Sequence, residues 1–410
     1  MPTFSNSLRR FRRVPALVRV LGLGFVLALA VCLPTSSYAT IKKTDRVDGV
    51  VWTRRGTPKG ALPDVELKAG AVVTADGRVL WSRGENTQRA MASITKIMTA
   101  IVAIENSGPD AKVTIPPLVS VAGESSAGLK AGETMTRYEL LEALLVKSGN
   151  DAALAVARII AGSEEAFVQL MNDKAADLGL EHTHFENPHG LDQRGHYTSA
   201  ADIATMARYA MNIDEFRQIV GKKSVKVKTA QGTHTLENTN ILLQSYTGAN
   251  GVKTGWTDDA GYCVVESAQR DGIELYAVVL GMPTDLGRFF AARDLLDFGF
   301  AHFRAQELAT QGTVVGRAAV TNFPDRSVPV AFSVDVTSVV YDLSGEIERK
   351  LTIDRTVAPV TQGQTLGSAT FVQGGKLVAK VPLVATETIE KPFLLVQWWY
   401  NLVKLWNYLF

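Results

Sequence analysis

Three short groups of polar residues in this chain have the types and spacing needed for nucleophilic chemistry. They are Ser93-Ile94-Thr95-Lys96, Ser148-Gly149-Asn150 and Lys253-Thr254-Gly255, and each pattern occurs once. A serine hydroxyl is a poor nucleophile until a base removes its proton. Lysine, whose ordinary pKa is about 10.4, becomes such a base only when burial or a neighbouring cation favours its neutral form. Ser93 and Lys96 are three residues apart, so a helix would place them one turn apart on the same face.

The other two groups supply what a serine–lysine pair requires. Lys253 can provide the neighbouring cation, Ser148 can relay a proton, and the Asn150 amide can hold a peptide group of a substrate. Ser93 precedes an apolar run, so we expect it at the N-terminus of a helix, where the partial positive charge stabilises anions. The alternative for the first group alone is a capping serine followed by a solvated lysine. Three unique groups in order favour a catalytic serine.

The elements around these residues predict an α+β fold. Asp76-Gly77 separates two short β runs and predicts a hairpin, and Thr136 with Glu139 matches a capping box. A block of helices followed by further strands predicts one antiparallel sheet beside a helical cluster. The expected helices cover 93–106, 136–147, 151–162, 164–179, 199–212 and 286–303, and the expected strands cover 71–75, 78–81, 261–269 and 274–281.

Flanking this region are segments of different composition. Residues 40–65 are polar and contain several Gly and Pro, which predicts an extended lead-in or linker. Residues 305–389 contain Val-rich and Thr-rich runs between turn residues and lack a helical period, which predicts a small all-β domain.

The N-terminus has the features of a secretory signal peptide. Five arginines and no acidic residue precede an apolar run from Val20 to Leu33, and small residues at Ser37 and Ala39 favour cleavage after Ala39. The run is short for a transmembrane helix. Arg9-Arg10 weakly resembles a twin-arginine signal, and Leu29–Cys32 weakly resembles a lipoprotein box in which Val31 is unusually large. We therefore expect an exported protein that lacks residues 1–39.

The C-terminus, residues 390–410, is the most aromatic part of the chain. Polar residues at 397, 401, 404 and 407 follow one helix face, while Leu and Trp occupy the opposite face. This pattern predicts an amphipathic helix at a membrane interface. A helix that packs on the protein's own core is the alternative.

Composition excludes several other classes of protein. The 410 residues are 46% hydrophobic and 20% charged, with a formal net charge of +2, which excludes a disordered chain and gives no reason to expect nucleic acid binding. Removal of Cys32 with the leader would leave Cys263 alone, in an apolar run typical of a buried thiol. His182, His184 and His189 lie close in sequence but form no His-Glu-x-x-His pattern, so we expect no metal and no cofactor.

Further segments extend the three groups into a family resemblance. They are Thr183–Asp192, Gly195–Ala200, Asn238–Leu243 and Gly251–Asp258. With the three groups, they resemble the serine-acylating penicillin-binding superfamily, and more closely the exported D-alanyl-D-alanine carboxypeptidases, the low-molecular-weight penicillin-binding proteins. The resemblance runs from about residue 66 to the C-terminus. It implies a transpeptidase-like domain over 66–304, followed by the β domain and an anchor helix.

The resemblance also implies roles for individual residues. Ser93 would be acylated, Lys96 would be the base, and Ser148 and Asn150 would complete the site. Lys253, Thr254 and Gly255 would lie on an edge strand beside the substrate. Backbone N–H groups of Ser93 and Trp256 would form the oxyanion hole; some relatives have histidine at the latter position. Arg288, paired with Thr254, would approach the substrate's terminal carboxylate; a surface arginine is the alternative.

The implied substrate is a peptidoglycan pentapeptide stem, from which the terminal D-alanine is removed, and β-lactams would be covalent inhibitors. A β-lactamase is the rival within the superfamily, but the Glu-x-x-Leu-Asn sequence of the commonest class does not occur after Ser148. Transpeptidation or cleavage of crosslinks remains open. A catalytically silent wall-binding protein is the rival from another class.

Overall fold

The computed structural model describes residues 41–117, 125–229, 232–323 and 326–409. The predicted leader over 1–39 lies outside the described residues.

Seven antiparallel strands form the central sheet, in the order β2-β1-β4-β3-β11-β10-β9. The strands β10 and β11 are long and apolar because they are buried on both faces of the sheet. Along β11, Tyr276 and Val278 face one hydrophobic core, whereas Ala277 and Val279 face a second, as the two-residue period of a strand requires. The bounds are β1 (Arg46–Val47), β2 (Val50–Val51), β3 (Ala69–Thr74), β4 (Val79–Arg83), β9 (Ala249–Thr257), β10 (Gly261–Arg270) and β11 (Ile273–Met282).

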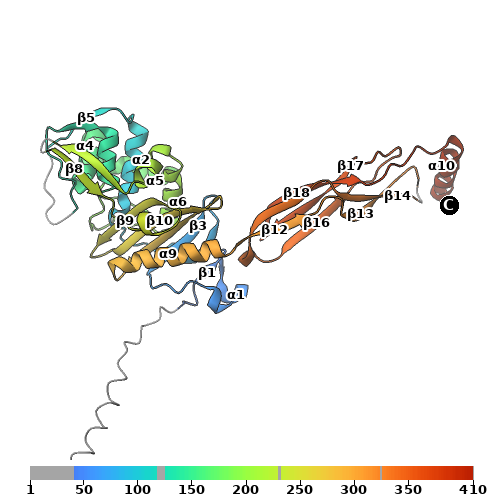
Figure 1. Cartoon of the computed structure of the whole chain (residues 1–410), viewed down its shortest axis with the longest axis horizontal. Helices are drawn as coiled ribbons and strands as arrows, with labels where there is room; N and C mark the ends of the chain where they lie inside the picture. Colours follow the sequence, from blue (N-terminus) through green and yellow to red (C-terminus); the bar gives the residue numbers. More distant parts are fainter. Residues whose placement is uncertain (1–40, 118–124, 230–231, 324–325, 410) are drawn as a thin grey trace, which may run out of the picture. The chain divides into compact units, whose positions relative to one another are not determined.

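Helices cover both faces of this sheet (Figure 1). One face carries α9 (Asp285–Ala301), and the other carries a cluster in which α2 is buried along most of its length. The predicted capping box of Thr136 and Glu139 starts α3. The α+β prediction is thus confirmed. The cluster consists of α2 (Lys96–Asn106), α3 (Arg137–Leu145), α4 (Asn150–Ala161), α5 (Glu164–Asp177), α6 (Ala200–Met211) and α7 (Asp214–Val220).

Short elements complete this domain. Two two-stranded sheets were not expected from the sequence: β5 (Lys112–Thr114) with β6 (Thr134–Thr136), and β7 (Ser224–Thr229) with β8 (Gly232–Glu237). The remaining ones are α1 (Trp52–Arg55), η1 (Lys59–Ala61), η2 (Ala92–Thr95) and α8 (Leu242–Ser245).

The expected lead-in over 40–65 is instead part of the folded domain from residue 41 onward. Strand β1 pairs with both β2 and β4, and Val47, Leu62 and Val65 are buried in the core beneath α9. Asp45 is fully buried, and its carboxylate accepts two 2.7 Å hydrogen bonds from Arg83. A polar composition was therefore misleading here, because the charged residues are paired within the domain.

The segment after α9 folds as the predicted all-β domain. A two-stranded sheet pairs β12 with β15, and a five-stranded sheet has the order β13-β14-β18-β17-β16 around its own hydrophobic core. Its elements are β12 (Phe303–Ala309), β13 (Val314–Ala319), β14 (Ser327–Phe332), β15 (Val336–Tyr341), η3 (Asp342–Ser344), β16 (Ile347–Ile353), β17 (Thr365–Gln373) and β18 (Lys376–Ala385).

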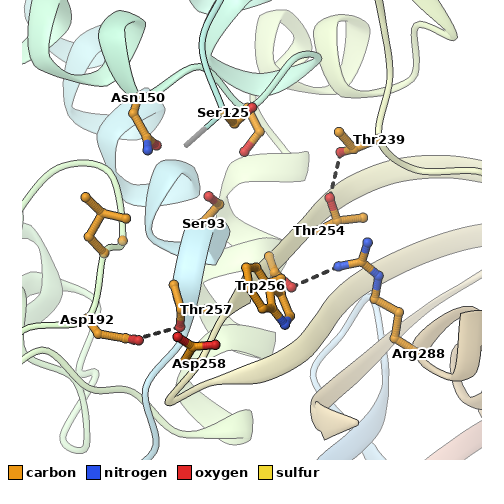
Figure 2. Close-up of a pocket in the computed structure, with 14 residues that line it drawn as sticks. Ser93, Ser125, Asn150, Asp192, Thr239, Thr254, Trp256, Thr257, Asp258 and Arg288 are labelled. Atoms are coloured by element: carbon orange, nitrogen blue, oxygen red, sulfur yellow. Dashed lines mark hydrogen bonds between the residues drawn. The ribbon is translucent and has the colours of Figure 1, made fainter. Parts of the chain in front are cut away.

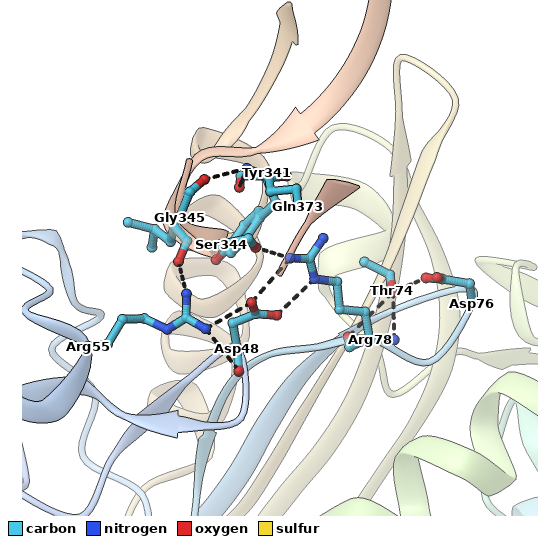
Figure 3. Close-up of polar contacts among 10 residues, drawn as sticks. Asp48, Arg55, Thr74, Asp76, Arg78, Tyr341, Ser344, Gly345 and Gln373 are labelled. Atoms are coloured by element: carbon cyan, nitrogen blue, oxygen red, sulfur yellow. Dashed lines mark hydrogen bonds and ion pairs between the residues drawn. The ribbon is translucent and has the colours of Figure 1, made fainter. Parts of the chain in front are cut away.

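A polar cluster connects the β domain to the N-terminal strands (Figure 3). Asp48, which follows β1, accepts hydrogen bonds from Arg55 at 3.0 Å and from Arg78 Nε at 2.9 Å. Arg55 in turn donates to the carbonyl of Leu343, and Arg78 donates to the hydroxyl of Ser344. One carboxylate thus orients two arginines that both reach η3.

The final helix is α10 (Leu394–Leu409). Several of its large apolar side chains are exposed, including Leu395 at 82%, Trp398 at 66% and Trp406 at 65%. In the described part of the chain, every helix is too short or too polar to cross a bilayer.

Candidate active site

A cleft of about 610 Å³ opens between the edge strand β9 and the turn that leads into α2 (Figure 2). It contains seven of the nine site residues predicted from sequence; Lys96 and Lys253 lie buried beside it. Its lining consists of Ser93, Ser125, Ser148, Asn150, Gly190, Leu191, Asp192, Thr239, Thr254, Gly255, Trp256, Thr257, Asp258 and Arg288.

Ser93 and Lys96 are joined across the junction of η2 and α2. The Lys96 Nζ atom donates to Ser93 Oγ at 2.8 Å, to Asn150 Oδ1 at 2.6 Å and to the His189 carbonyl at 2.8 Å. Lys96 is fully buried, so its amine is aimed at Ser93 by fixed oxygens rather than by solvent. The spacing of three residues thus places the Lys96 amine within hydrogen-bond distance of the Ser93 hydroxyl, as the sequence predicts.

Ser148 and Lys253 form a second pair at the cleft. Lys253 Nζ donates to Ser148 Oγ at 2.8 Å and to the Thr254 carbonyl at 2.9 Å. Burial, reinforced by the charges of Lys96 and Arg288, holds the pKa of Lys253 well below its ordinary value. Ser148 has a positive φ of 66°, which places its hydroxyl in the bend before α4 rather than within the helix.

Strand β9 brings its backbone directly against the serine. A Cβ atom on Gly255 would lie 2.9 Å from the Ser93 backbone nitrogen, so glycine is required for this approach. Strand β9 is the end strand of the sheet, and its residues from Thr254 to Thr257 line the cleft. Trp256, the next residue, is 53% exposed and packs beside Tyr262 at the rim.

Arg288 lies at the base of the cleft, on α9. It is 8% exposed, its Nη1 donates to the Gly255 carbonyl at 2.9 Å, and its Nη2 forms an ion pair with Asp285 at 2.5 Å. The hydroxyl of Thr254, with which Arg288 was expected to act, shares a 2.6 Å hydrogen bond with Thr239. Both residues line the cleft, and Arg288 is buried rather than a surface arginine.

Several residues that contribute to this site were not singled out from the sequence. Thr239 orients Thr254, the His189 carbonyl orients Lys96, and Asp192 accepts a 2.6 Å hydrogen bond from Thr257 at the rim. All three, Thr239, His189 and Asp192, lie in segments that carry the family resemblance. The sequence has no local pattern that assigns a role to a backbone carbonyl.

A buried lysine bonded to a serine at the end of a helix, beside an open strand edge, defines a serine enzyme of the acyl-transfer class. Within the described residues, no group of three or more His, Cys, Asp and Glu side chains is arranged to hold a metal ion.

Comparisons with known proteins specify the class. Residues 59–284 match the family described as D-alanyl-D-alanine carboxypeptidase, and residues 303–391 match the C-terminal domain of penicillin-binding protein 5. The chain belongs to the D-alanyl-D-alanine carboxypeptidase family.

Individual relatives extend over most of the chain. The carboxypeptidase DacF of Bacillus subtilis is 34% identical over 339 residues, covering 80% of this chain and 86% of the relative. DacD of Escherichia coli is 33% identical, covering 79% and 87%. Among solved structures, DacD of Francisella tularensis has a TM-score of 0.60 at 26% identity and covers 80% of this chain and 94% of that chain. The penicillin-binding protein 5 structure from Haemophilus influenzae gives 0.59 at 26% identity, with 80% and 99% coverage. The chain is thus a serine-type D-Ala-D-Ala carboxypeptidase by family.

Proposed function

We propose that this enzyme trims peptidoglycan pentapeptide stems through an acyl-enzyme on Ser93. The observation that carries this assignment is the 2.8 Å contact between Lys96 Nζ and Ser93 Oγ at the floor of the cleft. Neutral Lys96 accepts the proton of Ser93 as the hydroxyl attacks the carbonyl between the two terminal D-alanines. The C–N bond then breaks, the proton passes to the departing D-alanine, and water hydrolyses the ester to release a tetrapeptide stem.

The remaining residues have roles that follow from their positions. Ser148, bonded to Lys253, relays the proton toward the leaving amine, and Asn150 holds Lys96 and contacts the substrate. The positive charge of Arg288 suits a terminal carboxylate, to which Lys253 and Thr254 would also donate hydrogen bonds. The free edge of β9 offers its backbone groups to an extended peptide as an added strand.

The oxyanion hole is assigned to two backbone N–H groups, those of Ser93 and Trp256. The close approach of Gly255 to the Ser93 nitrogen supports this assignment, because it brings the two chain segments together. Donors fixed in this way need no reorganisation when negative charge develops.

The test of this proposal is covalent. Intact-mass measurement after exposure to a penicillin should show one adduct, which peptide mapping should place on Ser93. Ser93→Ala should give no adduct, whereas Ser245→Ala, at an exposed serine at the end of α8, should react as the wild type does. An adduct that survives Ser93→Ala contradicts the assignment.

Release of D-alanine from diacetyl-lysyl-D-alanyl-D-alanine tests the reaction itself. The wild type should release it and Ser93→Ala should not. Product analysis with a wall-derived amine acceptor distinguishes hydrolysis from transpeptidation, and a crosslinked dimer tests endopeptidase action.

We further propose that the mature enzyme starts near Thr40 and is held on the outer face of the cytoplasmic membrane by residues 390–410. The exposed Leu and Trp side chains of α10 support interfacial binding. N-terminal sequencing of the protein recovered from the cell envelope should begin at Thr40; retention of residues 1–39 contradicts export by leader cleavage.

A further inference from the structure

The turn that carries the proposed nucleophile has an unfavourable backbone conformation. Ala92, immediately before Ser93, has a φ of +50° and is 1% exposed. This region is sterically unfavourable for a residue with a Cβ atom, which adopts it only where the surroundings enforce it. Neighbouring contacts must therefore hold Ala92 in place, and with it the direction of the Ser93 hydroxyl and N–H.

Two buried side chains form the contact that holds this turn. Thr95 Oγ1 donates to the Ala92 carbonyl at 2.8 Å, and the same hydroxyl lies 2.8 Å from Nε2 of His196. Thr95 is fully buried and His196 is 5% exposed. His196 is 101 positions away in sequence, so it ties a distant segment to the serine turn.

The hydrogen-bond geometry fixes the protonation of His196. A hydroxyl has one proton, and Thr95 gives it to Ala92, so Thr95 must accept from Nε2–H of the ring. The other ring nitrogen, Nδ1, accepts from the Glu186 backbone N–H at 3.0 Å. The ring is therefore neutral with its proton on Nε2, because a protonated Nδ1 would face another donor. Burial lowers the pKa of His196 to about 4, which agrees with this state.

The segment that contains His196 also positions the base. The His189 carbonyl accepts from Lys96 Nζ at 2.8 Å. Gly190, with φ +95°, packs so closely on the turn that a Cβ atom would lie 2.0 Å from the Ala92 carbonyl oxygen. Residues 186–196 thus contact both the serine turn and Lys96. Within this segment, the His196 side chain forms the hydrogen bond to Thr95 of the turn.

We infer that His196 is a positioning residue for acylation, which acts through Thr95 to hold Ala92 and so aims Ser93 into the cleft. This inference rests on the proposed role of Ser93. It predicts that loss of the Nε2–H donor misdirects the nucleophile and lowers the rate of its attack, while substrate binding is retained.

Two substitutions of His196 separate its two hydrogen bonds. His196→Gln keeps a donor near the position of Nε2 and can still reach Thr95. His196→Asn keeps an acceptor near the position of Nδ1 for Glu186 but does not reach Thr95. Acylation by a fluorescent penicillin should slow about 10²-fold in His196→Asn, the usual size for a misplaced reacting group, and less than about fivefold in His196→Gln. With the D-Ala-D-Ala peptide, kcat should fall in His196→Asn while KM stays within twofold.

A second pair of variants tests the same path from Thr95. Thr95→Val removes the hydroxyl and should slow acylation like His196→Asn, whereas Thr95→Ser should restore it. The double variant Thr95→Val/His196→Asn should be no slower than the slower single variant, because both remove one connection. Multiplying effects, or equal losses in the Gln and Asn variants, would overturn the inference. If His196→Asn does not fold, as judged by thermal unfolding, the Val and Ser variants of Thr95 decide the matter.

The outcome is distinguishable from failure of the proposed function. If the wild-type enzyme forms no adduct on Ser93, the proposed function itself is refuted. An adduct that forms on Ser93 at the wild-type rate in both His196→Asn and Thr95→Val leaves the function intact and refutes the positioning role.

Discussion

Lys96 and Lys253 are 0% and 1% exposed, although both are ionisable. Burial of a lysine amine is costly unless fixed hydrogen-bond partners replace its water. Serine, asparagine and carbonyl oxygens do so here, and the side chains are consequently held in a single arrangement before any substrate arrives. This preorganisation is what a serine–lysine pair requires for rapid proton transfer.

Glu266 on β10 is a buried acid with a different consequence. It is fully buried, Asn240 donates to one of its oxygens at 2.7 Å, and burial raises the pKa of its carboxyl well above the ordinary 4.5. The folded chain thus keeps a proton that the unfolded chain loses near pH 4.5. Glu266 should therefore lower the free energy of unfolding as the pH rises above that value.

Glu266→Gln should abolish this pH dependence. At pH 8 we expect the free energy of unfolding of the variant to exceed that of the wild type by about 2 kcal/mol, a typical penalty for a buried polar group that lacks hydrogen-bond partners. Urea unfolding measured from pH 5 to pH 8 checks this. Glu348→Gln, at an exposed position on β16, serves as the control and should follow the wild-type curve; identical slopes for all three proteins contradict the prediction.

Gly255→Ala tests the contact between β9 and the serine turn. The added Cβ would meet backbone atoms of Ser93 and Ile94 at 2.9 and 3.2 Å, and backbone cannot rotate away. We expect penicillin acylation to slow about 10²-fold. Gly108→Ala, where the Cβ enters open space, should retain the wild-type rate. Unchanged acylation in Gly255→Ala would mean that the turn tolerates displacement.

At the level of residues, the sequence predicts the groups with a fixed local spacing. Ser93 and Lys96 are one helical turn apart, and their contact follows from that. The connection from His196 to Thr95 could not be predicted, because it depends on the fold of residues that are far apart in sequence. The positive φ of Ala92 could not be predicted either, because this backbone region is typical of glycine and the residue here is alanine.

Among the elements, β1 shows how composition can mislead. Its segment is rich in charge, yet the strand is built into the sheet because Asp45 pairs with Arg83 and Val47 faces the core. Regular periods in α2–α6, β10 and β11 made those elements predictable. A two-residue strand has no period, and its pairing with β4 is a long-range contact.

Two valines of this segment provide a matched comparison. Val47 is fully buried and Val50 is 40% exposed. Val47→Asp should lower the free energy of unfolding by more than about 3 kcal/mol, because it buries an unpaired charge. Val50→Asp should change it by less than about 1 kcal/mol. Denaturant titration measures both, and equal effects would indicate that β1 does not contribute to the core.

The cluster around Asp48 should couple the β domain to the catalytic domain. Asp48→Ala leaves Arg55 and Arg78 without their shared carboxylate, so their bonds to Leu343 and Ser344 lose orientation. We expect calorimetry to show two separated transitions where the wild type shows one. Glu85→Ala, which removes a more exposed ion pair with Arg46, should leave the single transition unchanged. A single transition in Asp48→Ala would assign the coupling to other contacts.

For the whole molecule, the C-terminal helix should decide where the enzyme acts. Deletion of residues 391–410 removes the exposed apolar side chains of α10 while leaving the two folded domains. The truncated enzyme should stay in the supernatant with phosphatidylglycerol vesicles, whereas the full chain sediments. Release of D-alanine from a soluble peptide should be equal in both.

Point substitutions check that the apolar face is responsible. Trp398→Ser with Trp406→Ser should weaken vesicle binding, and Asn401→Ser, on the polar stripe, should not. Sedimentation of the truncated enzyme with vesicles would contradict the anchor role.

The two ends of the central sheet differ in a way that bears on self-association. An open strand edge is a template for any extended chain, including another copy of the same protein. At one end, β2 has only two residues and runs directly into α1, so it offers little to pair with. At the other end, β9 is nine residues long and lies beside the cleft. The molecule thus concentrates its capacity to recruit a foreign strand at one place. A peptide that pairs with the free edge of β9 would lie beside Ser93. The same edge that could cause aggregation would then bind the substrate.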